Sequence, residues 1–328
     1  MQRDELINIF RLLISIVSGE GRGEALFGSE ISMVEAAFDR ALSGWTFPMV
    51  YLEFPLMGKP CCDLGAGYGE ELFRYGTLPD AQAFGYRKAL DYFATISGKK
   101  AAFGYSMDLS RGDTERAGLY LQHCGNYDLI GPFLSACGEE ARIPHYMTVS
   151  ERLGKSWQSD YIAFFPGRPG TPTRLGGYAF GSDDLRELFN LAGFTAWETD
   201  MIELCRELST LCKPADYQFD ILSDGTLSDD FGIAFSFGSQ TRPKIVAGSL
   251  RSGPGAKLMK KLQEIRLIDD RWKMLPDAVF ARALPFKADD GSEKLIALAV
   301  LLNMVKIKFK AGIPRSVKFY IALEASEL

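Results

Sequence analysis

The last part of the chain, VKIKFKAGIPRSVKFYIALE at residues 305–324, alternates apolar and basic residues strictly. Val305, Ile307 and Phe309 alternate with lysines, and the same period resumes after a turn around Gly312-Ile313-Pro314. A period of two residues is that of a β-strand, so the segment predicts a hairpin with one apolar face and one lysine-rich face. Because lysine is rarely buried without a partner, the surroundings of the second face constrain the fold.

Four further strand pairs precede this hairpin, and helical segments separate them. The pairs are 47–56 with 59–68, 101–110 with 116–123, 160–167 with 173–181, and 217–222 with 230–238. Their short connections contain Gly, Asp or Pro, which is typical of hairpins. Apolar residues at helical spacing predict helices at 1–18, 30–43, 79–97, 127–141, 182–194, 199–212 and roughly 254–284, while 145–153 is ambiguous.

Five hairpins supply ten antiparallel strands, and an open sheet of that size would expose two hydrogen-bonding edges. Closure removes these edges, so we expect an α+β fold: a ten-stranded antiparallel β-barrel of five α-β-β-α repeats, ringed by helices, as a single domain over 1–328. The apolar strand faces would then lie against the helices, and Lys306, Lys308, Lys318 and Tyr320 would face the interior. The alternative is a solvated hairpin whose lysines protect a sheet edge.

The overall composition argues against several classes of function. The 328 residues are 47% hydrophobic and 24% charged with a formal net charge of −5, so no general basic surface suits nucleic acid or an anionic membrane. The apolar run at 7–17 lacks a basic flank and contains Arg11, which favours an amphipathic helix over a signal peptide. Six cysteines without a Cys-x-x-Cys pair, and only two histidines, argue against zinc and predict free thiols in the cytoplasm.

Two strands and the order of elements carry a family resemblance. RSVKFYI (315–321) has an in-phase Lys-x-Tyr, and VYLEFPL (50–56) has a glutamate between apolar neighbours. With the α–β–β–α order, these strands resemble the aromatic prenyltransferases of the ABBA barrel type, which include bacterial aromatic, indole and cyanobactin peptide prenyltransferases. The resemblance implies transfer of a dimethylallyl or similar short prenyl group from an allylic diphosphate to an electron-rich aromatic or peptide side-chain acceptor. Natural product biosynthesis or peptide modification would be the setting.

A diphosphate taken out of water requires several converging cations or strong donors. Arginine binds two phosphate oxygens together, lysines act as movable point charges, and both stabilise the departing diphosphate as the C–O bond breaks. Alternate positions of neighbouring strands supply such groups. The candidate diphosphate-binding residues are Arg174, Tyr178, Lys306, Lys308, Lys318 and Tyr320.

The allylic cation needs electron-rich walls, and the acceptor needs a base. Tyr51, Tyr120 and Asp63 are candidate wall residues for the prenyl group and acceptor, although each tyrosine could instead be a core residue with a satisfied hydroxyl. The resemblance implies that Glu53 orients the acceptor and takes its proton, with Asp63 as a second candidate. The alternative for Glu53 is an ion pair or a position facing solvent.

Two other functions stay open at this point. CCDLGAGYGEEL (61–72) resembles the first motif of S-adenosylmethionine methyltransferases, in which glycines let the backbone approach the cofactor, but that fold needs a parallel sheet. A non-catalytic ligand-binding barrel is the other alternative. The pattern Asp-Asp-x-x-Asp would indicate a magnesium site, but none of the adjacent Asp-Asp pairs in this chain completes it. We therefore expect no cofactor and no dedicated metal site, although Mg²⁺ is compatible with the chain.

Overall fold

The computed structural model describes residues 3–41, 49–68, 87–96, 101–111, 117–154, 157–168, 170, 172–179, 184–194, 199–237, 242–288 and 290–328. Its strands belong to one continuous sheet. They are β1 (Met49–Pro55), β2 (Asp63–Tyr68), β3 (Ala102–Met107), β4 (Gly118–Gln122), β5 (Trp157–Phe164), β6 (Thr173–Ala179), β7 (Lys213–Ile221), β8 (Leu227–Ser236), β9 (Phe280–Lys287), β10 (Glu293–Lys310) and β11 (Ile313–Glu327).

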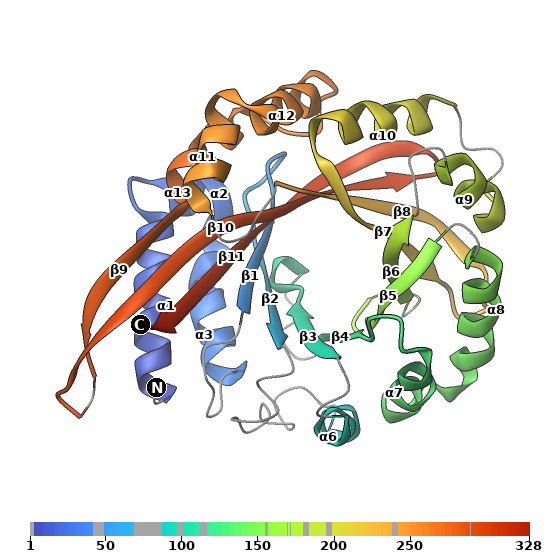
Figure 1. The fold of residues 1–328 in the computed structure, drawn as a ribbon, viewed down its shortest axis with the longest axis horizontal. Helices are drawn as coiled ribbons and strands as arrows, with labels where there is room; N and C mark the ends of the chain where they lie inside the picture. Colours follow the sequence, from blue (N-terminus) through green and yellow to red (C-terminus); the bar gives the residue numbers. More distant parts are fainter. Residues whose placement is uncertain are drawn as a thin grey trace.

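Ten of these strands close into an antiparallel ring. Each strand from β1 to β8 pairs with the next, β8 pairs with β10, β10 pairs with β11, and β11 returns to β1. The remaining strand, β9, pairs with residues 293–300 of β10, and this part extends beyond the ring (Figure 1). The expected ten-stranded barrel is therefore confirmed, and the ring itself leaves no unpaired edge.

The two ends of the barrel differ in their connections. The five predicted hairpins are β1–β2, β3–β4, β5–β6, β7–β8 and β10–β11, so their turns lie at one end, called here the hairpin end. Longer segments with helices connect the strands at the opposite end, called here the helix end (Figure 1). The last hairpin turns at Ala311 and Gly312, with φ of 47° and 78°. Positive φ at both residues suits a two-residue hairpin turn, and Pro314 lies already inside β11.

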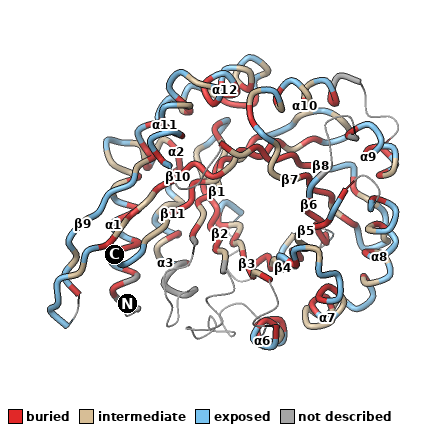
Figure 2. Tube along the Cα trace, in the orientation of Figure 1, coloured by how far each residue is buried: buried red, intermediate tan, exposed pale blue. Residues whose placement is uncertain are grey.

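Helices surround the barrel, with their buried faces toward the strands (Figure 2). They are α1 (Arg3–Ser18), α2 (Arg22–Phe27), α3 (Ile31–Ala41), α6 (Arg87–Thr95), α7 (Ile130–Ala136), α8 (Ile143–Leu153), α9 (Asp184–Ala192), α10 (Thr199–Leu211), α11 (Pro243–Ser252), α12 (Pro254–Glu264) and α13 (Leu275–Ala278). Single 3₁₀ turns are η1 (Gly28–Glu30), η2 (Leu109–Arg111), η3 (Tyr127–Leu129), η4 (Glu140–Arg142) and η5 (Asp270–Met274). No helix in the described part of the chain is long and apolar enough to cross a bilayer.

The main core lies between the outer strand faces and the helices. The Phe54 ring on β1 lies 4.9 Å from Phe27 of α2 and 5.9 Å from Phe319 of β11, measured between ring centroids. Val305 and Ile307 share this outward phase and are fully buried. Burial of one such side chain contributes about 1.5–3 kcal/mol. Since the apolar phase packs on helices, the lysine phase of the last hairpin must face the barrel interior.

The C-terminal third contains the main correction to the expected elements. The predicted helix at 254–284 ends at Glu264, where Arg266 adopts φ 58° without the glycine that would have marked the end. Residues 280–287 form the strand β9 instead, and β10 begins at Glu293, before the expected start at 305. The ambiguous segment 145–153 is helical in α8, with Pro144 in its first turn. The predicted Ser182 N-cap and residues 79–86 lie outside the described residues.

Candidate active site

The lysines of the last hairpin point into the barrel. Lys306 is only 5% exposed, and the side chain of Lys318, its register partner on the neighbouring strand, is 22% exposed. Lys308 is half-buried, whereas Lys310, at the end of β10, is 55% exposed. The alternative of a solvated, edge-protecting hairpin is therefore wrong. A ten-stranded barrel is also wider than the eight-stranded barrels that side chains alone can fill.

Lys318 lies between two carboxylates near the hairpin end. Its Nζ forms a close ion pair with Glu53 on β1 and lies 3.1 Å from Asp63 Oδ2 on β2. Asp63 Oδ1 accepts hydrogen bonds from Ser110 N at 2.9 Å and from Ser110 Oγ at 2.7 Å. Burial raises the pKa of Glu53, but Lys318 and then Lys306 outweigh this and hold it well below its usual range. Glu53 is therefore ionised, and Asp63 fixes the lysine beside it.

Lys306 and Lys308 differ from the other interior cations because no carboxylate among the described residues forms an ion pair with either. Lys306 lies over an aromatic face: its Nζ is 4.8 Å from the ring centroid of Tyr320. Burial lowers the pKa of Lys306 to about 8, against the opposing effect of Glu53. Burial and then Arg174 hold the pKa of Lys308 well below its usual range. Both amines would gain from a bound anion.

Arg174 and Arg168 are each committed to an aspartate. Arg174 on β6 makes a bidentate pair with Asp220 of β7, at 2.7 and 2.9 Å. Arg168, in the β5–β6 loop, pairs likewise with Asp108, with both contacts at 2.8 Å. Their guanidinium carbons lie 4.8 and 3.8 Å from the ring centroid of Phe165. This bidentate, stacked geometry orders the hairpin end and reduces the positive charge that is available there.

The described interior charges nearly balance. The cations Arg168, Arg174, Lys306, Lys308 and Lys318 lie among the anions Glu53, Asp63, Asp108, Asp160, Asp216 and Asp220. An incoming diphosphate must therefore compete with Asp220 for Arg174, and with Glu53 and Asp63 for Lys318. Only Lys306 and Lys308 can bind it without such competition.

The candidate tyrosines occupy different parts of the interior. Tyr120 lies with its ring centroid 5.5 Å from Phe165 and 6.0 Å from Tyr161. Tyr51 follows the same inward phase at the helix end, and burial and then Glu324 raise its pKa to about 12. Tyr178 does not join the lysines: it is 49% exposed, and its hydroxyl lies 3.4 Å from Asp160 Oδ2.

The interior also contains several charged and polar residues that the sequence analysis does not predict. Asp216, Gln218 and Asp220 alternate along β7, so the period that revealed the lysines could have revealed them too. Arg168 and Asp108 lie in connections, where no period exists. Tyr161 was hidden by a bulge: the register between β5 and β6 shifts between Ser159 and Tyr161, which turns this ring inward. A Cβ on Gly176 would lie 1.9 Å from Tyr161 Cε1, so only glycine accommodates the ring there.

The glycine-rich string at 61–72 forms no cofactor loop in its described part. Residues 63–68 are strand β2, which pairs antiparallel with both β1 and β3. Its glycines at 65 and 67 lie under the Tyr51 side chain, with their Cβ positions 3.6–3.7 Å from it. Since the whole sheet is antiparallel, the methyltransferase alternative is wrong.

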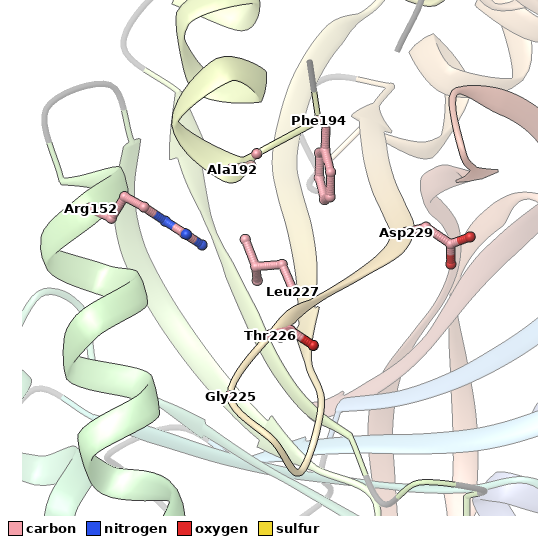
Figure 3. Close-up of a pocket in the computed structure, with 8 residues that line it drawn as sticks. Arg152, Ala192, Phe194, Gly225, Thr226, Leu227 and Asp229 are labelled. Carbon is pink, nitrogen blue, oxygen red and sulfur yellow. The ribbon is translucent and has the colours of Figure 1, made fainter. Parts of the chain in front are cut away.

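A second hollow lies outside the barrel interior, between the ends of α8 and α9 and the β7–β8 turn (Figure 3). It has a volume of about 470 Å³, and Arg152 points into it toward Leu227. None of the interior charges described above lines it, so it is separate from the candidate active site. Among the described residues no group of three or more His, Cys, Asp or Glu side chains could hold a metal ion.

Comparison with known proteins identifies the fold. The sequence matches no family model and no curated protein. Among solved structures, the prenyltransferase PriB with its product diphosphate superposes with a TM-score of 0.56 at 12% identity, covering 97% of this chain and 96% of that chain. The fold is that of the ABBA prenyltransferases. PriB with L-tryptophan and dimethylallyl thiolodiphosphate gives a TM-score of 0.53 at 12% identity over the same shares of both chains. The NotF prenyltransferase gives 0.50 at 11% identity, covering 98% and 92%.

The ABBA barrel explains the overall arrangement of this chain but not its charges. At 11–12% identity the likeness concerns the fold. The residues inside the ABBA barrel must therefore be interpreted from their own geometry.

Proposed function

We propose that this protein transfers a dimethylallyl or similar short prenyl group from an allylic diphosphate to an electron-rich aromatic or peptide side-chain acceptor. The supporting observation is the pair Lys306 and Lys308, two enclosed amines without carboxylate partners in the described chain, inside a barrel of the ABBA fold. Solved structures of PriB, a protein of that fold, include a complex with diphosphate and a complex with L-tryptophan and a thiolo analogue of dimethylallyl diphosphate.

Lys306 and Lys308 would be the principal diphosphate ligands. Binding would restore their protonated forms, and their charge would stabilise the diphosphate as it leaves with the electrons of the C–O bond. Arg174 and Lys318 would also bind the diphosphate to the extent that it displaces their present partners, which are Asp220 for Arg174 and Glu53 and Asp63 for Lys318. The face of Tyr320, already beside an ammonium group at 4.8 Å, would shield the allylic cation, with Tyr120 and Tyr51 as further walls. We leave Tyr178 out of the diphosphate set because it lies beside Asp160.

Glu53 would receive the acceptor's proton. The acceptor attacks the allylic carbon, a new bond forms, and the acceptor becomes positively charged. An ionised Glu53 stabilises that charge and then removes the proton, which restores the neutral product. A carboxylate with a low pKa suffices, because the cationic intermediate is strongly acidic. Asp63 would act through Lys318 rather than on the substrate.

The cellular setting is part of the same proposal. All six cysteines are free thiols, which suits a reducing cytoplasm. We propose that the reaction uses no organic cofactor and no dedicated metal, because lysines and arginines supply the positive charge at the diphosphate.

The test is calorimetric titration with dimethylallyl diphosphate, followed by mass spectrometry of reactions with indole and phenol acceptors. Binding together with a prenylated product supports the proposal. Binding without turnover of any acceptor, including peptides, would favour a non-catalytic ligand-binding barrel. Absence of binding would refute the donor assignment.

A further inference from the structure

A second group of charges, which takes no part in the steps above, extends from the helix end of the barrel into its interior, where Asp216 is in register with Lys306 through Ala234. Asp160 lies at the β5 bulge, where the backbone N–H groups of His123 and Cys124 donate to its carbonyl oxygen at 2.9 and 3.1 Å. Its side-chain Oδ2 accepts from Gln122 Nε2 at 2.9 Å and lies 3.4 Å from the Tyr178 hydroxyl. Gln122 and Tyr178 are exposed, so this part of the group is open to solvent.

Asp216 forms the inner part of the same group. Its Oδ2 accepts from Tyr161 Oη at 3.1 Å and from Gln218 Nε2 at 2.9 Å. Burial, and then the charge of Asp216, raise the pKa of Asp160, so the two carboxylates interact. We call these residues the acidic rim: Gln122, Asp160, Tyr161, Asp216, Gln218 and Tyr178.

The acidic rim has no direct ion pair with a described residue, and the cations that act on Asp216 electrostatically, Lys306 and Arg174, do so without contacting it. Asp63, Asp108 and Asp220 each have a lysine or arginine nitrogen within 3.1 Å, whereas neither rim aspartate forms an ion pair with any residue that the structure describes. Asp216 Oδ1 is inaccessible to solvent and accepts no hydrogen bond from the described residues. A buried, unsatisfied carboxylate oxygen costs about 1–3 kcal/mol or more, so a donor that reached it would bind favourably.

The walls of the rim suit a cation. Tyr161 and Tyr120, with ring centroids 6.0 Å apart, present aromatic surface beside Asp216. Aromatic faces and carboxylates both attract ammonium and guanidinium groups, and both are unfavourable for a carboxylate ligand. The rim also lies in the same interior as Glu53, so a molecule held at the rim can extend toward that residue.

We propose that the acidic rim binds a positively charged group of the acceptor, an amine or a guanidinium, while the electron-rich part of the acceptor extends toward Glu53. This rests on the proposed function for the identity of the ligand as an acceptor. Gln122 and Tyr178 hold Asp160, and Tyr161 and Gln218 hold Asp216, so that the free oxygen of Asp216 receives an N–H of the bound cation.

The experiment compares three ligands with one ring system: tryptamine, 3-ethylindole and indole-3-propionate, which carry an amine, no charge and a carboxylate. Each is titrated calorimetrically into the full chain at pH 8, with and without dimethylallyl thiolodiphosphate. We expect tryptamine to bind about tenfold or more tightly than 3-ethylindole, as one charge-assisted hydrogen bond requires, and the carboxylate to bind most weakly. Asp216→Asn should remove most of the tryptamine preference and leave 3-ethylindole binding unchanged.

One matched control variant and one second rim variant accompany Asp216→Asn. Glu293→Gln removes a carboxylate from an exposed position of β10 outside the barrel interior and should change neither affinity. Asp160→Asn, at the more accessible position, should reduce the preference by a smaller factor and provides the test if Asp216→Asn does not fold.

Equal affinities of tryptamine and 3-ethylindole for the wild-type protein would overturn the proposal, as would an equal loss of both in Asp216→Asn. Displacement of tryptamine by Mg²⁺ alone would also overturn it, because the rim would then be a metal site. A tryptamine preference without prenyl transfer would count against the proposed function only, and transfer without the preference would count against the rim only.

Discussion

The two ends of the barrel interior contain similar residue types but arrange their charges in opposite ways. Toward the hairpin end Asp63, Asp108 and Asp220 each have a cationic partner, whereas Lys306 and Lys308 form no ion pair with a described residue. Toward the helix end the acidic rim has two carboxylates that accept hydrogen bonds from tyrosine and glutamine and likewise form no ion pair with a described residue. Lys306, in register with Asp216 through Ala234 of β8, acts on that carboxylate electrostatically. The difference predicts that net charge alone does not decide what this interior binds. We expect binding to depend on whether each charged side chain already has an oppositely charged partner.

This separation gives the barrel a direction. An anionic donor is attracted toward the lysines and a cationic acceptor toward the rim, so the two substrates would enter with their reactive parts between the two groups. Glu53, paired with Lys318 in the same interior, would act on the acceptor where these reactive parts meet. Pre-arranged charges of this kind need no reorganisation during the reaction.

Glu53→Gln tests the region between the two ends and should have the largest effect. Loss of the base should lower kcat by about 100-fold or more, the usual range for general base catalysis. Donor affinity should not fall, because the variant releases Lys318 to meet the diphosphate. Single-turnover kinetics and calorimetry separate the two quantities. Full activity would exclude Glu53 as the base, and a parallel loss of donor binding would place it in the donor site.

Lys308→Met tests the hairpin end alone. Loss of one hydrogen bond to a charged group costs about 1.5–3 kcal/mol, so the donor Kd should rise about ten- to a hundredfold. Acceptor affinity at the rim should stay within about twofold, since neither rim carboxylate is among the main charges that act on Lys308. Lys310→Met is the matched control, in the same strand and phase but exposed and paired with Asp229 at 3.3 Å. An equal rise of the donor Kd in Lys308→Met and Lys310→Met would mean that donor binding depends only on the overall charge of the protein.

These predictions rest on features that the sequence reveals to different degrees. The barrel could be predicted because hairpin turns and alternation are local signals, and five antiparallel pairs leave closure as the simplest arrangement. The cations of β10 and β11 could be placed by phase alone. Their partners could not: Asp63 meets Lys318 across 255 positions of sequence, and no local pattern encodes that contact.

The misread elements have equally specific causes. Phe280, Ala283 and Leu284 satisfy a helical period, whereas Phe280, Leu284 and Phe286 satisfy a strand period, and only the pairing with β10 selects the strand. Tyr178 continues the inward phase of Arg174 and was therefore grouped with the cations. The phase gives the side of a strand but not the height along the barrel, and Tyr178 lies four residues beyond Arg174 on β6, where its hydroxyl is beside Asp160.

The pH dependence of donor binding should distinguish surplus from paired cations. Lys306, with a pKa of about 8 in the free protein, is charged below pH 8 and largely neutral above it. A bound diphosphate favours the charged form, so donor affinity should fall by up to about tenfold per pH unit above pH 8. The donor itself does not titrate there, since its last ionisation is near pH 6.

Lys306→Met should weaken binding and make this pH profile flatter, while Lys308, whose pKa is also lowered, retains part of the slope. Arg174 and Lys318, with raised pKa values, contribute no slope in this range. Donor affinity that is constant from pH 7.5 to 9.5 would mean that paired cations bind the diphosphate instead.

The smallest expected effect concerns the aromatic face beside Lys306. The hydroxyl of Tyr320 lies toward Glu53, its register partner on β1, whereas its ring lies 4.8 Å from Lys306 Nζ. Tyr320→Phe keeps the face and should change donor affinity by less than about twofold. Tyr320→Leu removes a cation–π contact worth about 1 kcal/mol and should weaken binding about fivefold. The affinity is measured with dimethylallyl thiolodiphosphate. A larger loss of affinity in Tyr320→Phe than in Tyr320→Leu would assign the role to the hydroxyl. The hairpin end would then bind its donor through hydrogen bonding as well as charge.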